Sequence, residues 1–561
     1  MLQENLIKIY EESFRENHSL PVLTDYFSKK TITYLEMAEQ MARLHLLFDK
    51  LGIKHGDKIA LVGRNDINWC VAYIATITYG VVIVPILQDF NSADIENIVT
   101  HSESRLLFAG EAHWQNLDTE RMPLLEAAFS LKHFDVVYEK EGNVAAEALK
   151  TWEADFEAKY PNGFKVEDIK FNAIPNEEMI LLNYTSGTTG SSKGVMISLN
   201  NLTGNMVFGR GFINPETGSP FLFKRGRVLS FLPLAHAYGA AFDFLAQLVV
   251  GGHITLLGRM PSPSILVEAM KTVKPTMICC VPLVLEKVYR KMIMPMLEKG
   301  PMSIAMKIPL VNTALYAIIR SKLLESFGGE TQIFIVGGAP MNQETESFLR
   351  KINFPLTIGY GMTECAPLIS VTAPCEFKQG SCGRYLPGFM DVKIDSKDPQ
   401  RVAGEILVHG ENVMMGYNKN EEATKAVLDE DGWLHTGDMG IMDPDGTIYI
   451  KGRCKTMILT GTGQNIYPEE IEDKLNNLPL VLESLIIESK GVLKALIVPD
   501  YDQAAQENID KEALKTMMEE NIKMLNTMVA SYEKVALFEI RESEFEKTPK
   551  RSIKRFLYQD K

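Results

Sequence analysis

Y-T-S-G-T-T-G-S-S-K-G-V-M-I-S, residues 184–198, is the stretch from which the fold and chemistry of this chain are best read. Residues 185–192 carry six hydroxyl side chains, glycines are interspersed among them, and one cation, Lys193, follows. Glycines let backbone N–H groups face a ligand, and hydroxyls add donors that rotate to meet several oxygens. The apolar runs 179–182 and 195–197 predict a short strand on each side. A donor-rich loop between two strands suits a triphosphate.

This loop has two other interpretations. A Walker A loop requires Ser or Thr after its lysine and a helix that opens there, whereas Gly194 follows Lys193. A surface turn is the commoner meaning of Gly, Ser and Thr in a loop. The density of hydroxyls and glycines around one lysine favours phosphate binding over a plain turn.

Composition limits the class of protein. A chain of 561 residues is too long for one core and predicts two or more domains. The net charge of −14 argues against a general nucleic-acid binder, which needs a basic face. Seven scattered cysteines without a C-x-x-C pair favour a reducing compartment. The N-terminus has no signal-peptide pattern, and the longest apolar run, residues 72–87, is interrupted. We therefore expect a soluble cytoplasmic protein, with peripheral contact to the inner face of a membrane left open.

The first part of the chain alternates between strand and helix patterns. Thr33 is placed to cap a helix that ends near Gly52. The further predicted elements are strands at 58–62, 81–84 and 106–109 and helices at 68–80 and 90–101. Such alternation predicts β-α-β units and a mostly parallel sheet flanked by helices. Residues 110–178 lack a clear pattern, and we expect them to form a peripheral elaboration.

Three strand ends carry candidate site residues. His236 ends the strand that starts at Val228, although a lone histidine is more often structural. Small residues follow strand 332–336, and Pro340 is expected to start a helix there. After strand 355–358, Tyr360 can stack on a base, Thr363 can donate to a phosphate and Glu364 can hold a hard cation. An ordinary capped turn is the alternative for this last motif.

The sequence pattern changes after about residue 380. Short strands and glycine turns predict a small β-barrel-like subdomain, at about 380–453, in which Asp438 is a suitable acceptor for ribose hydroxyls. Beyond a hinge near Lys455, a second glycine-rich loop with Gly461 and Gly463 precedes a helix, two strands and a long helix over 504–528. The chain ends in a basic tail, which is either a solvated terminus or a phosphate contact.

These motifs, in this order, resemble the adenylate-forming (AMP-binding) enzyme superfamily, and in particular the long-chain fatty acid–CoA ligases. The likeness runs from Thr33 to about Arg555, and it is carried by Y-T-S-G-T-T-G-x-x-K-G-V and L-P-L-A-H-x-Y. The resemblance implies a large N-terminal α/β domain over 1–453 and a mobile α+β domain over 454–561. It also implies a two-step ligation: ATP and a fatty acid give acyl-AMP and pyrophosphate, and CoA then displaces AMP. The implied cofactors are ATP, Mg²⁺ and CoA.

The resemblance also assigns roles to individual residues. Thr185 to Lys193 would hold the β- and γ-phosphates, Glu364 with Thr185 would hold Mg²⁺, and Thr363 would contact the α-phosphate. His236 would lie at the mouth of the acyl pocket, Lys455 at the hinge, and Gly461 and Gly463 along the thiol's path. The complete set of nucleotide contacts implied in this way is Thr185, Ser186, Gly187, Thr188, Thr189, Lys193, Gly338, Ala339, Pro340, Gly359, Tyr360, Gly361, Met362, Thr363, Asp438 and Arg453.

One position departs from the family pattern. The family usually carries a catalytic lysine in a run such as T-P-T-x-K-I-K-R, and the chain has T-P-K-R-S-I-K-R, with Ser552 at the lysine's place. Our hypothesis is that Lys554 or Lys550 supplies the missing charge. Two alternatives remain open: an acyl-AMP ligase or acyl–carrier-protein synthetase that hands the acyl group to another protein, and, because of Ser552, a non-catalytic relative that binds nucleotide or an acyl group.

Overall fold

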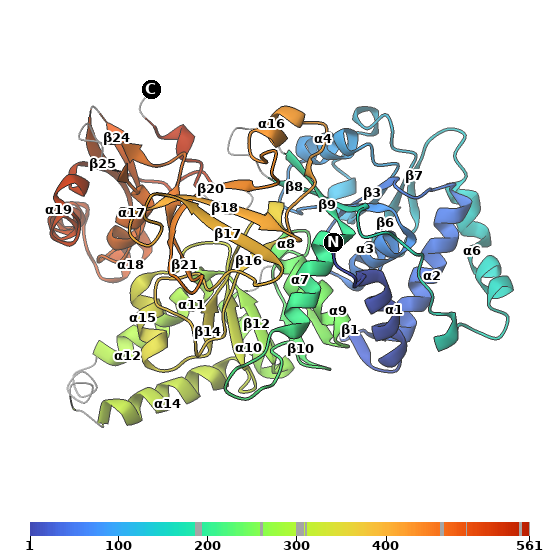
Figure 1. Cartoon of the computed structure of the whole chain (residues 1–561), viewed down its shortest axis with the longest axis horizontal. Coiled ribbons are helices and arrows are strands. Elements are labelled where there is room, and N and C mark those ends of the chain that lie inside the picture. Colours follow the sequence, from blue (N-terminus) through green and yellow to red (C-terminus); the bar gives the residue numbers. More distant parts are fainter. Residues whose placement is uncertain are drawn as a thin grey trace.

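The computed structural model describes residues 1–185, 193–258, 262–298, 308, 311–459, 465–489, 491–548 and 553–559. It divides into a large N-terminal domain and a smaller C-terminal domain, which is the fold class expected from the sequence. Figure 1 shows the C-terminal elements, orange to red, at one end of the molecule and α6 (Ala145–Lys159) at the other. Among the described helices, none combines the length and the apolar character needed to cross a bilayer.

The largest sheet has eight strands in the order β19-β9-β8-β4-β3-β5-β6-β7. Its central strands run parallel, as the β-α-β pattern predicts, and β9, β19 and β7 are antiparallel additions. Their bounds are β3 Lys58–Val62, β4 Val82–Ile86, β5 Leu106–Ala109, β6 Ala127–Ser130, β7 Val136–Glu139, β8 Met179–Thr185, β9 Lys193–Ser198 and β19 Gly416–Tyr417. The helices that follow the first strands are α3 (Ile67–Tyr79) and α4 (Ser92–Ser102), and α2 (Tyr34–Lys50) precedes them. Thr33 and Glu36 form a capping box at the start of α2, as the sequence predicts.

Residues 110–178 are more than a peripheral elaboration, and that expectation was wrong. Strands β6 and β7 extend the main sheet, with β6 parallel to β5 and β7 antiparallel to β6. Helix α6 then packs beside α2, where the Trp152 indole donates to the carbonyl of Arg43. The alanines of β6 and the charged residues around β7 weaken the apolar signal by which the equally short β5 is recognised in the sequence.

Two further sheets complete the N-terminal α/β part. One has the order β10-β11-β1-β2 and the other the order β12-β13-β14, which is parallel throughout. Their bounds are β1 Pro21–Asp25, β2 Thr31–Thr33, β10 Arg227–Ser230, β11 His253–Leu256, β12 Met277–Cys280, β13 Ile333–Val336 and β14 Leu356–Ile358. Helix α15 (Gln343–Lys351) follows β13, but it starts after Asn342, whose side chain caps it, and not at Pro340 as predicted.

A four-stranded antiparallel sheet forms the β-rich part of the N-terminal domain. Its order is β17-β18-β20-β21, with bounds Met390–Asp395, Gly404–Gly410, Leu434–Met442 and Ile448–Arg453. The register of β20 and β21 places Asp438 opposite Arg453. This pairing brings two of the predicted nucleotide contacts together across one strand pair.

The C-terminal domain contains α17 (Pro468–Asn476), β24 (Val481–Ser489), β25 (Val492–Pro499), α19 (Lys511–Met528) and β26 (Val535–Ile540). It has its own apolar core, separate from the N-terminal one. The single helix predicted over 504–528 is wrong: α18 (Tyr501–Gln506) ends before it, Asn508 has a positive φ of 56°, and Asp510 caps α19.

The two domains meet along α17. The Arg290 guanidinium, from the helix that starts at Pro282, donates to the carbonyl of Asn476 at 3.0 Å. Asn342 at the start of α15 bonds Asn477, and Asp473 accepts a hydrogen bond from the backbone of Gln343. Burial, with the nearby Glu286 carboxylate, raises the pKa of Asp473 to about 6. The domain contact therefore contains a carboxyl group that holds its proton to a higher pH than an exposed aspartate does.

Candidate active site

The predicted phosphate loop connects two paired strands. Strands β8 and β9 pair antiparallel, and the last pair joins Thr185 to Lys193. Ser186, Gly187, Thr188 and Thr189 lie outside the described residues. Tyr184 supports the base of the hairpin, since its hydroxyl bonds His101 Nδ1 at 2.7 Å. A Cβ added at Gly194 would lie 3.0 Å from the Tyr184 ring, so a larger residue at 194 would require the tyrosine ring to shift.

Lys193 is connected to Glu364 through Tyr417, a residue absent from the predicted site. The Lys193 ammonium lies over the ring of Tyr417, 4.7 Å from its centroid. The Tyr417 hydroxyl donates to Glu364 Oε1 at 2.9 Å. Tyr417 occupies the edge strand β19, which pairs with β9, and it is buried. Burial and the Glu364 carboxylate raise the pKa of Tyr417, so its hydroxyl stays protonated and remains a donor.

Glu364 and Thr363 lie in a tight turn after Tyr360. The turn is a 3₁₀ segment, Thr363–Cys365, and the backbone N–H of Met414 donates to the carbonyl of Glu364. A Cβ at Gly361 would lie 2.2 Å from the Pro367 carbonyl oxygen, so no other residue fits there without a backbone shift. The backbone on the two sides of this turn, at Gly361 and Pro367, is therefore held close together. The Met414 N–H fixes the backbone of Glu364, and the Tyr417 hydroxyl fixes its carboxylate.

Asp438 forms a second group with Tyr360 and Arg453. The Tyr360 hydroxyl donates to Asp438 Oδ2 at 2.7 Å, and the Arg453 Nε lies 3.3 Å from Asp438 Oδ1. Asp438 is 8 % exposed, and burial raises its pKa above the ordinary range, while Arg453 and the Tyr360 hydroxyl oppose that rise. The Glu364 carboxylate also raises the pKa of Asp438, so the two carboxylates lie within electrostatic reach of each other.

The predicted adenine ledge lies at the carboxyl end of β13. Gly337 is buried, whereas Gly338, Ala339 and Pro340 are exposed. Gly338 has a positive φ of 84°, which favours glycine, and an added Cβ would meet only Val281, at 3.9 Å. Tyr360 is 7 % exposed, and its hydroxyl is engaged by Asp438, so its ring is more enclosed than a free stacking platform. Gly359 and Met362 flank Tyr360 and Gly361 in the adjacent turn.

His236 occupies the first turn after β10. Its Nδ1 accepts from the backbone N–H of Tyr238 at 3.2 Å, which caps the short helix α8 (Ala237–Gly239). The Tyr238 hydroxyl donates to the carbonyl of Ile335 at 2.8 Å, and a Cβ added at Gly337 would lie 3.4 Å from the Tyr238 ring. Tyr238 therefore joins the turn of His236 to the strand that ends in the glycine ledge.

The structure describes only some of the site residues predicted for the C-terminal part of the chain. Lys455 lies in an exposed turn after β21, and Gly461 and Gly463 lie outside the described residues. Lys554 Nζ lies 3.5 Å from Glu546 Oε2, so in this arrangement its charge is directed to its own domain. Arg555 is paired with Glu472 on α17, which anchors the tail there. Lys550, Arg551 and Ser552 lie outside the described residues.

The donor set fits a magnesium–ATP complex better than a metal held by protein ligands alone. Within the described residues, no three His, Cys, Asp or Glu side chains gather into a metal-binding group. Mg²⁺ commonly takes one or two carboxylates, waters and phosphate oxygens of its substrate. Glu364 provides such a carboxylate, and the hydroxyl of Thr185 lies at the base of the phosphate hairpin.

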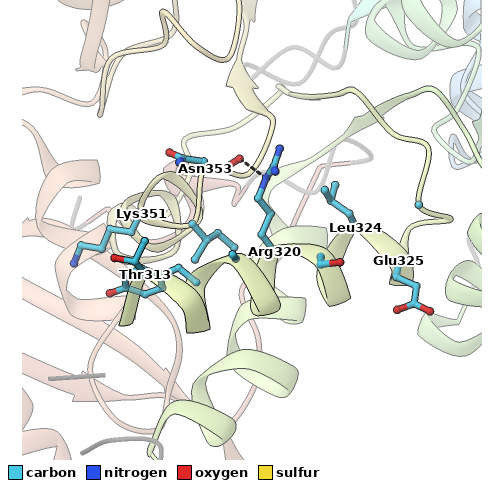
Figure 2. Close-up of a pocket in the computed structure, with 11 residues that line it drawn as sticks. Thr313, Arg320, Leu324, Glu325, Lys351 and Asn353 are labelled. Atoms are coloured by element: carbon cyan, nitrogen blue, oxygen red, sulfur yellow. Dashed lines mark hydrogen bonds between the residues drawn. The ribbon is translucent and has the colours of Figure 1, made fainter. Parts of the chain in front are cut away.

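The cavity beside the predicted site residues is small. A small cavity of about 10 Å³ lies next to Thr363 and is lined by Asn183, Ala237, Ala240 and Ala241 among others. That volume accommodates about one water molecule, not an acyl chain. A larger cavity of about 580 Å³ lies between α14 (Val311–Ser326) and the end of α15, and it contains none of the predicted site residues (Figure 2).

Two family models match this chain, and both describe AMP-binding enzymes. The model of the AMP-binding enzyme family matches residues 10–418, and the model of the AMP-binding enzyme C-terminal domain matches residues 455–560. The chain is 28 % identical over 472 residues to the long-chain-fatty-acid–CoA ligase ACSBG1 of Macaca fascicularis, with 78 % of this chain and 62 % of that protein covered. It is 27 % identical over 580 residues to the long-chain-fatty-acid–CoA ligase FadD15 of Mycobacterium bovis, with 94 % and 90 % covered.

Solved structures share the fold. The O-succinylbenzoate coenzyme A synthetase MenE of Bacillus subtilis, in complex with ATP and a magnesium ion, superposes with a TM-score of 0.71 at 22 % identity. The alignment covers 99 % of each chain. The chain thus spans the full architecture of that ligase, but less than two thirds of the length of the Macaca relative.

Proposed function

The chain belongs to the AMP-binding enzyme family, and we propose that it is an AMP-forming ligase that activates a long- or medium-chain fatty acid and transfers it to CoA. The observation that carries this proposal is the pair of connected groups in the site. Lys193, Tyr417 and Glu364 form one, and Tyr360, Asp438 and Arg453 form the other. The fatty-acid class is supported by the names of the relatives at 27–28 % identity.

The first half-reaction needs charge neutralisation above all. A carboxylate must attack the anionic α-phosphate, and the two groups repel each other unless cations and donors surround them. Lys193 and the hairpin loop would hold the β- and γ-phosphates, while the Thr363 hydroxyl would contact the α-phosphate. Mg²⁺, held by Glu364 and the phosphates with Thr185 nearby, would neutralise the leaving pyrophosphate.

The group of Tyr360, Asp438 and Arg453 would hold the nucleoside. Asp438, which accepts from the Tyr360 hydroxyl and is ion-paired with Arg453, offers carboxylate oxygens to the paired ribose hydroxyls. Adenine would lie against Gly338, Ala339 and Pro340, where the exposed backbone at the end of β13 leaves room for a flat ring. Gly359 to Met362 would form the opposing wall.

The second half-reaction would follow a change in domain orientation. We propose that residues 454–561 form the mobile domain, that Lys455 is its hinge, and that Gly461 and Gly463 line the path of the CoA thiol. The thiol would attack the acyl carbon of acyl-AMP, form the thioester and release AMP. His236, held at the N-terminus of α8, would lie near the carboxylate during both steps.

The charge that the usual C-terminal lysine supplies would come from Lys554 or Lys550. In the described arrangement Lys554 faces Glu546, so delivery of its charge requires the domain to rotate or the tail to shift. A peripheral position on the inner face of a membrane, in the cytoplasm, fits a ligase whose acid substrate dissolves in lipid.

The proposal is tested by product analysis. The purified protein is incubated with ATP, Mg²⁺, CoA and a panel of acids from acetate to oleate, and AMP, pyrophosphate and acyl-CoA are quantified. We expect equal amounts of AMP and thioester, with the highest rates for medium and long chains. A parallel reaction with an acyl carrier protein instead of CoA identifies a protein acceptor. Release of ADP, or of neither nucleotide with any acid, contradicts the proposal.

A further inference from the structure

Strand β20 bulges at the turn that carries the proposed ribose carboxylate. In its pairing with β18, Glu405 lies opposite Met439, and two residues further along β18 the partner is His435. Residues 436–438 of β20 therefore face a single residue of β18. Extra residues in one strand interrupt the ladder of hydrogen bonds and redirect a side chain. The backbone donors of such a bulge then need partners other than the facing strand's backbone.

The Glu405 side chain supplies one of these partners from the facing strand. Its Oε1 accepts from the backbone N–H of Gly437 at 3.0 Å, and its Oε2 lies 2.8 Å from His435 Nδ1. Because a carboxylate only accepts, His435 bonds it through a protonated Nδ1. The Glu405 side chain is 25 % exposed, so water competes only in part for its two bonds. One carboxylate thus holds the backbone of the bulge and the residue that precedes it.

The other polar groups of the bulge are also engaged. The Thr436 hydroxyl donates to the carbonyl of Ile406 at 2.7 Å and accepts from the backbone N–H of Asp438 at 3.1 Å. The carbonyl of Gly437 accepts from the backbone N–H of Cys454 at 2.9 Å, next to the proposed hinge. Gly437 has a positive φ of 72°, which favours glycine. Glu405 contributes the charged acceptor among these contacts.

Glu405 lies near Asp438 but bonds different groups. Burial, followed by the Glu405 and Asp438 carboxylates, raises the pKa of the Cys454 thiol, so both carboxylates lie within electrostatic reach of that one side chain. Both oxygens of Glu405 are used at the bulge, whereas the Asp438 carboxylate accepts from the Tyr360 hydroxyl. Glu405 is therefore placed to orient Asp438 through the backbone of β20.

We propose that Glu405 is a positioning residue for the nucleotide: by bonding Gly437 and His435, it holds the bulge of β20 in the form that directs Asp438 toward the ribose hydroxyls. The inference rests on the proposed function for the ribose contact of Asp438, and it adds that this contact depends on a carboxylate of the neighbouring strand. Without Glu405, the N–H of Gly437 would turn to water and the bulge would lose its single conformation. ATP would then bind less tightly and with less regard to its ribose.

The test compares ATP with 2′-deoxyATP in pyrophosphate exchange. Wild-type protein should prefer ATP at least about tenfold, because a site built to bond a hydroxyl rejects the analogue that lacks it. Glu405→Ala should reduce that preference at least about threefold and raise the KM for ATP about tenfold, with a smaller change in kcat. Glu405→Gln should restore most of the preference, because its amide oxygen can accept from Gly437 and its amide nitrogen can donate to the other tautomer of His435.

Two controls separate positioning from a general loss of structure. If Glu405 acts through Asp438, the double variant Glu405→Ala/Asp438→Asn should have a KM for ATP within about twofold of that of Asp438→Asn alone. Glu178 is likewise paired with a histidine, His55, and it lies at the far end of β8 from the phosphate loop. Glu178→Ala should leave the KM for ATP within about twofold of wild type. Thermal unfolding of each variant shows whether the compared proteins are folded.

Two results overturn the inference and leave the proposed function intact. One is a folded Glu405→Ala protein that keeps the wild-type preference for ATP over 2′-deoxyATP, and the other is full additivity of the two substitutions in the double variant. If Glu405→Ala does not fold, the same comparison is made with Glu405→Asp, whose shorter side chain cannot reach both partners. Wild-type protein that uses both nucleotides equally well, or neither, contradicts the ribose contact of the proposed function and the inference with it.

Discussion

The substitution of Tyr417 by Phe isolates one hydrogen bond in the proposed site. Phe keeps the ring beneath Lys193 and removes the hydroxyl that donates to Glu364 at 2.9 Å. A hydrogen bond to a charged group is worth about 1.5–3 kcal/mol. Since about 1.4 kcal/mol is a factor of ten, we expect kcat/KM for MgATP to fall about tenfold to a hundredfold. The carboxylate would lose its orientation while the fold remains intact.

The assay is ATP–pyrophosphate exchange at saturating fatty acid, because exchange reports the first half-reaction alone. Tyr417→Leu also removes the ring, and the lost cation–π contact should lower kcat/KM by a further two- to fivefold, from about 0.5–1 kcal/mol. Binding of a nonhydrolysable ATP analogue, with and without Mg²⁺, gives a readout that does not depend on turnover. The magnesium-dependent part of that affinity should fall in both variants.

The control is another tyrosine that donates to a carboxylate. The Tyr79 hydroxyl donates to Asp49 Oδ1 at 2.6 Å, in contact with α2 and away from the predicted site residues. Tyr79→Phe should leave exchange within about twofold of wild type. If Tyr417→Phe behaves like this control, Tyr417 does not position Glu364 for the reaction, and the reasoning is refuted.

Four other substitutions test three separate parts of the protein. Asp438→Asn removes the charge paired with Arg453. It should raise the KM for ATP about tenfold or more, with a smaller change in kcat, in pyrophosphate exchange at varied ATP. An unchanged KM would exclude a ribose contact. Asp473→Asn should stabilise the protein by about 1–2 kcal/mol at pH 7–8 and not at pH 4. The pKa of Asp473 is raised to about 6 in the folded protein, so the wild type loses stability as the pH rises through that value. Thermal unfolding that shows equal effects of the substitution at pH 4 and pH 8 would contradict this. Lys554→Ala should slow ATP–pyrophosphate exchange at least about tenfold, because it removes a cation beside the α-phosphate. If Lys554→Ala and Lys550→Ala both exchange at the wild-type rate, neither lysine supplies that charge.

Most of the core architecture could be predicted from the sequence because its strands and helices follow strong patterns. The parallel strands β3, β4 and β5 are continuous apolar runs, and α2 has both a capping box and apolar side chains at helical spacing. Strands β6 and β7 lack so strong a run, because β6 begins with two alanines and charged residues surround β7. The break between α18 and α19 depends on the positive φ of Asn508, which composition alone does not reveal.

Several predicted site residues come from dense local motifs. Glu364 and Asp438 belong to recognisable turns; the structure shows Asp438 in contact with the predicted Tyr360, and Glu364 in contact with Tyr417, which was not predicted. Tyr417 was missed because its partners Lys193 and Glu364 are far from it in sequence. Only the pairing of β19 with β9 brings Tyr417 to them, and a two-residue edge strand carries no periodic signal. A tyrosine preceded by glycine was the one local sign.

The transfer of oxygen from the acid to AMP tests the central claim most directly. The purified protein is given a fatty acid labelled with ¹⁸O in its carboxylate, together with ATP, Mg²⁺ and CoA, and the nucleotide product is analysed by mass spectrometry. If the carboxylate attacks the α-phosphate and the thiol then displaces AMP, the AMP carries one ¹⁸O atom and pyrophosphate carries none. Label in inorganic phosphate beside ADP, or thioester formed with unlabelled AMP, would contradict adenylation at this site.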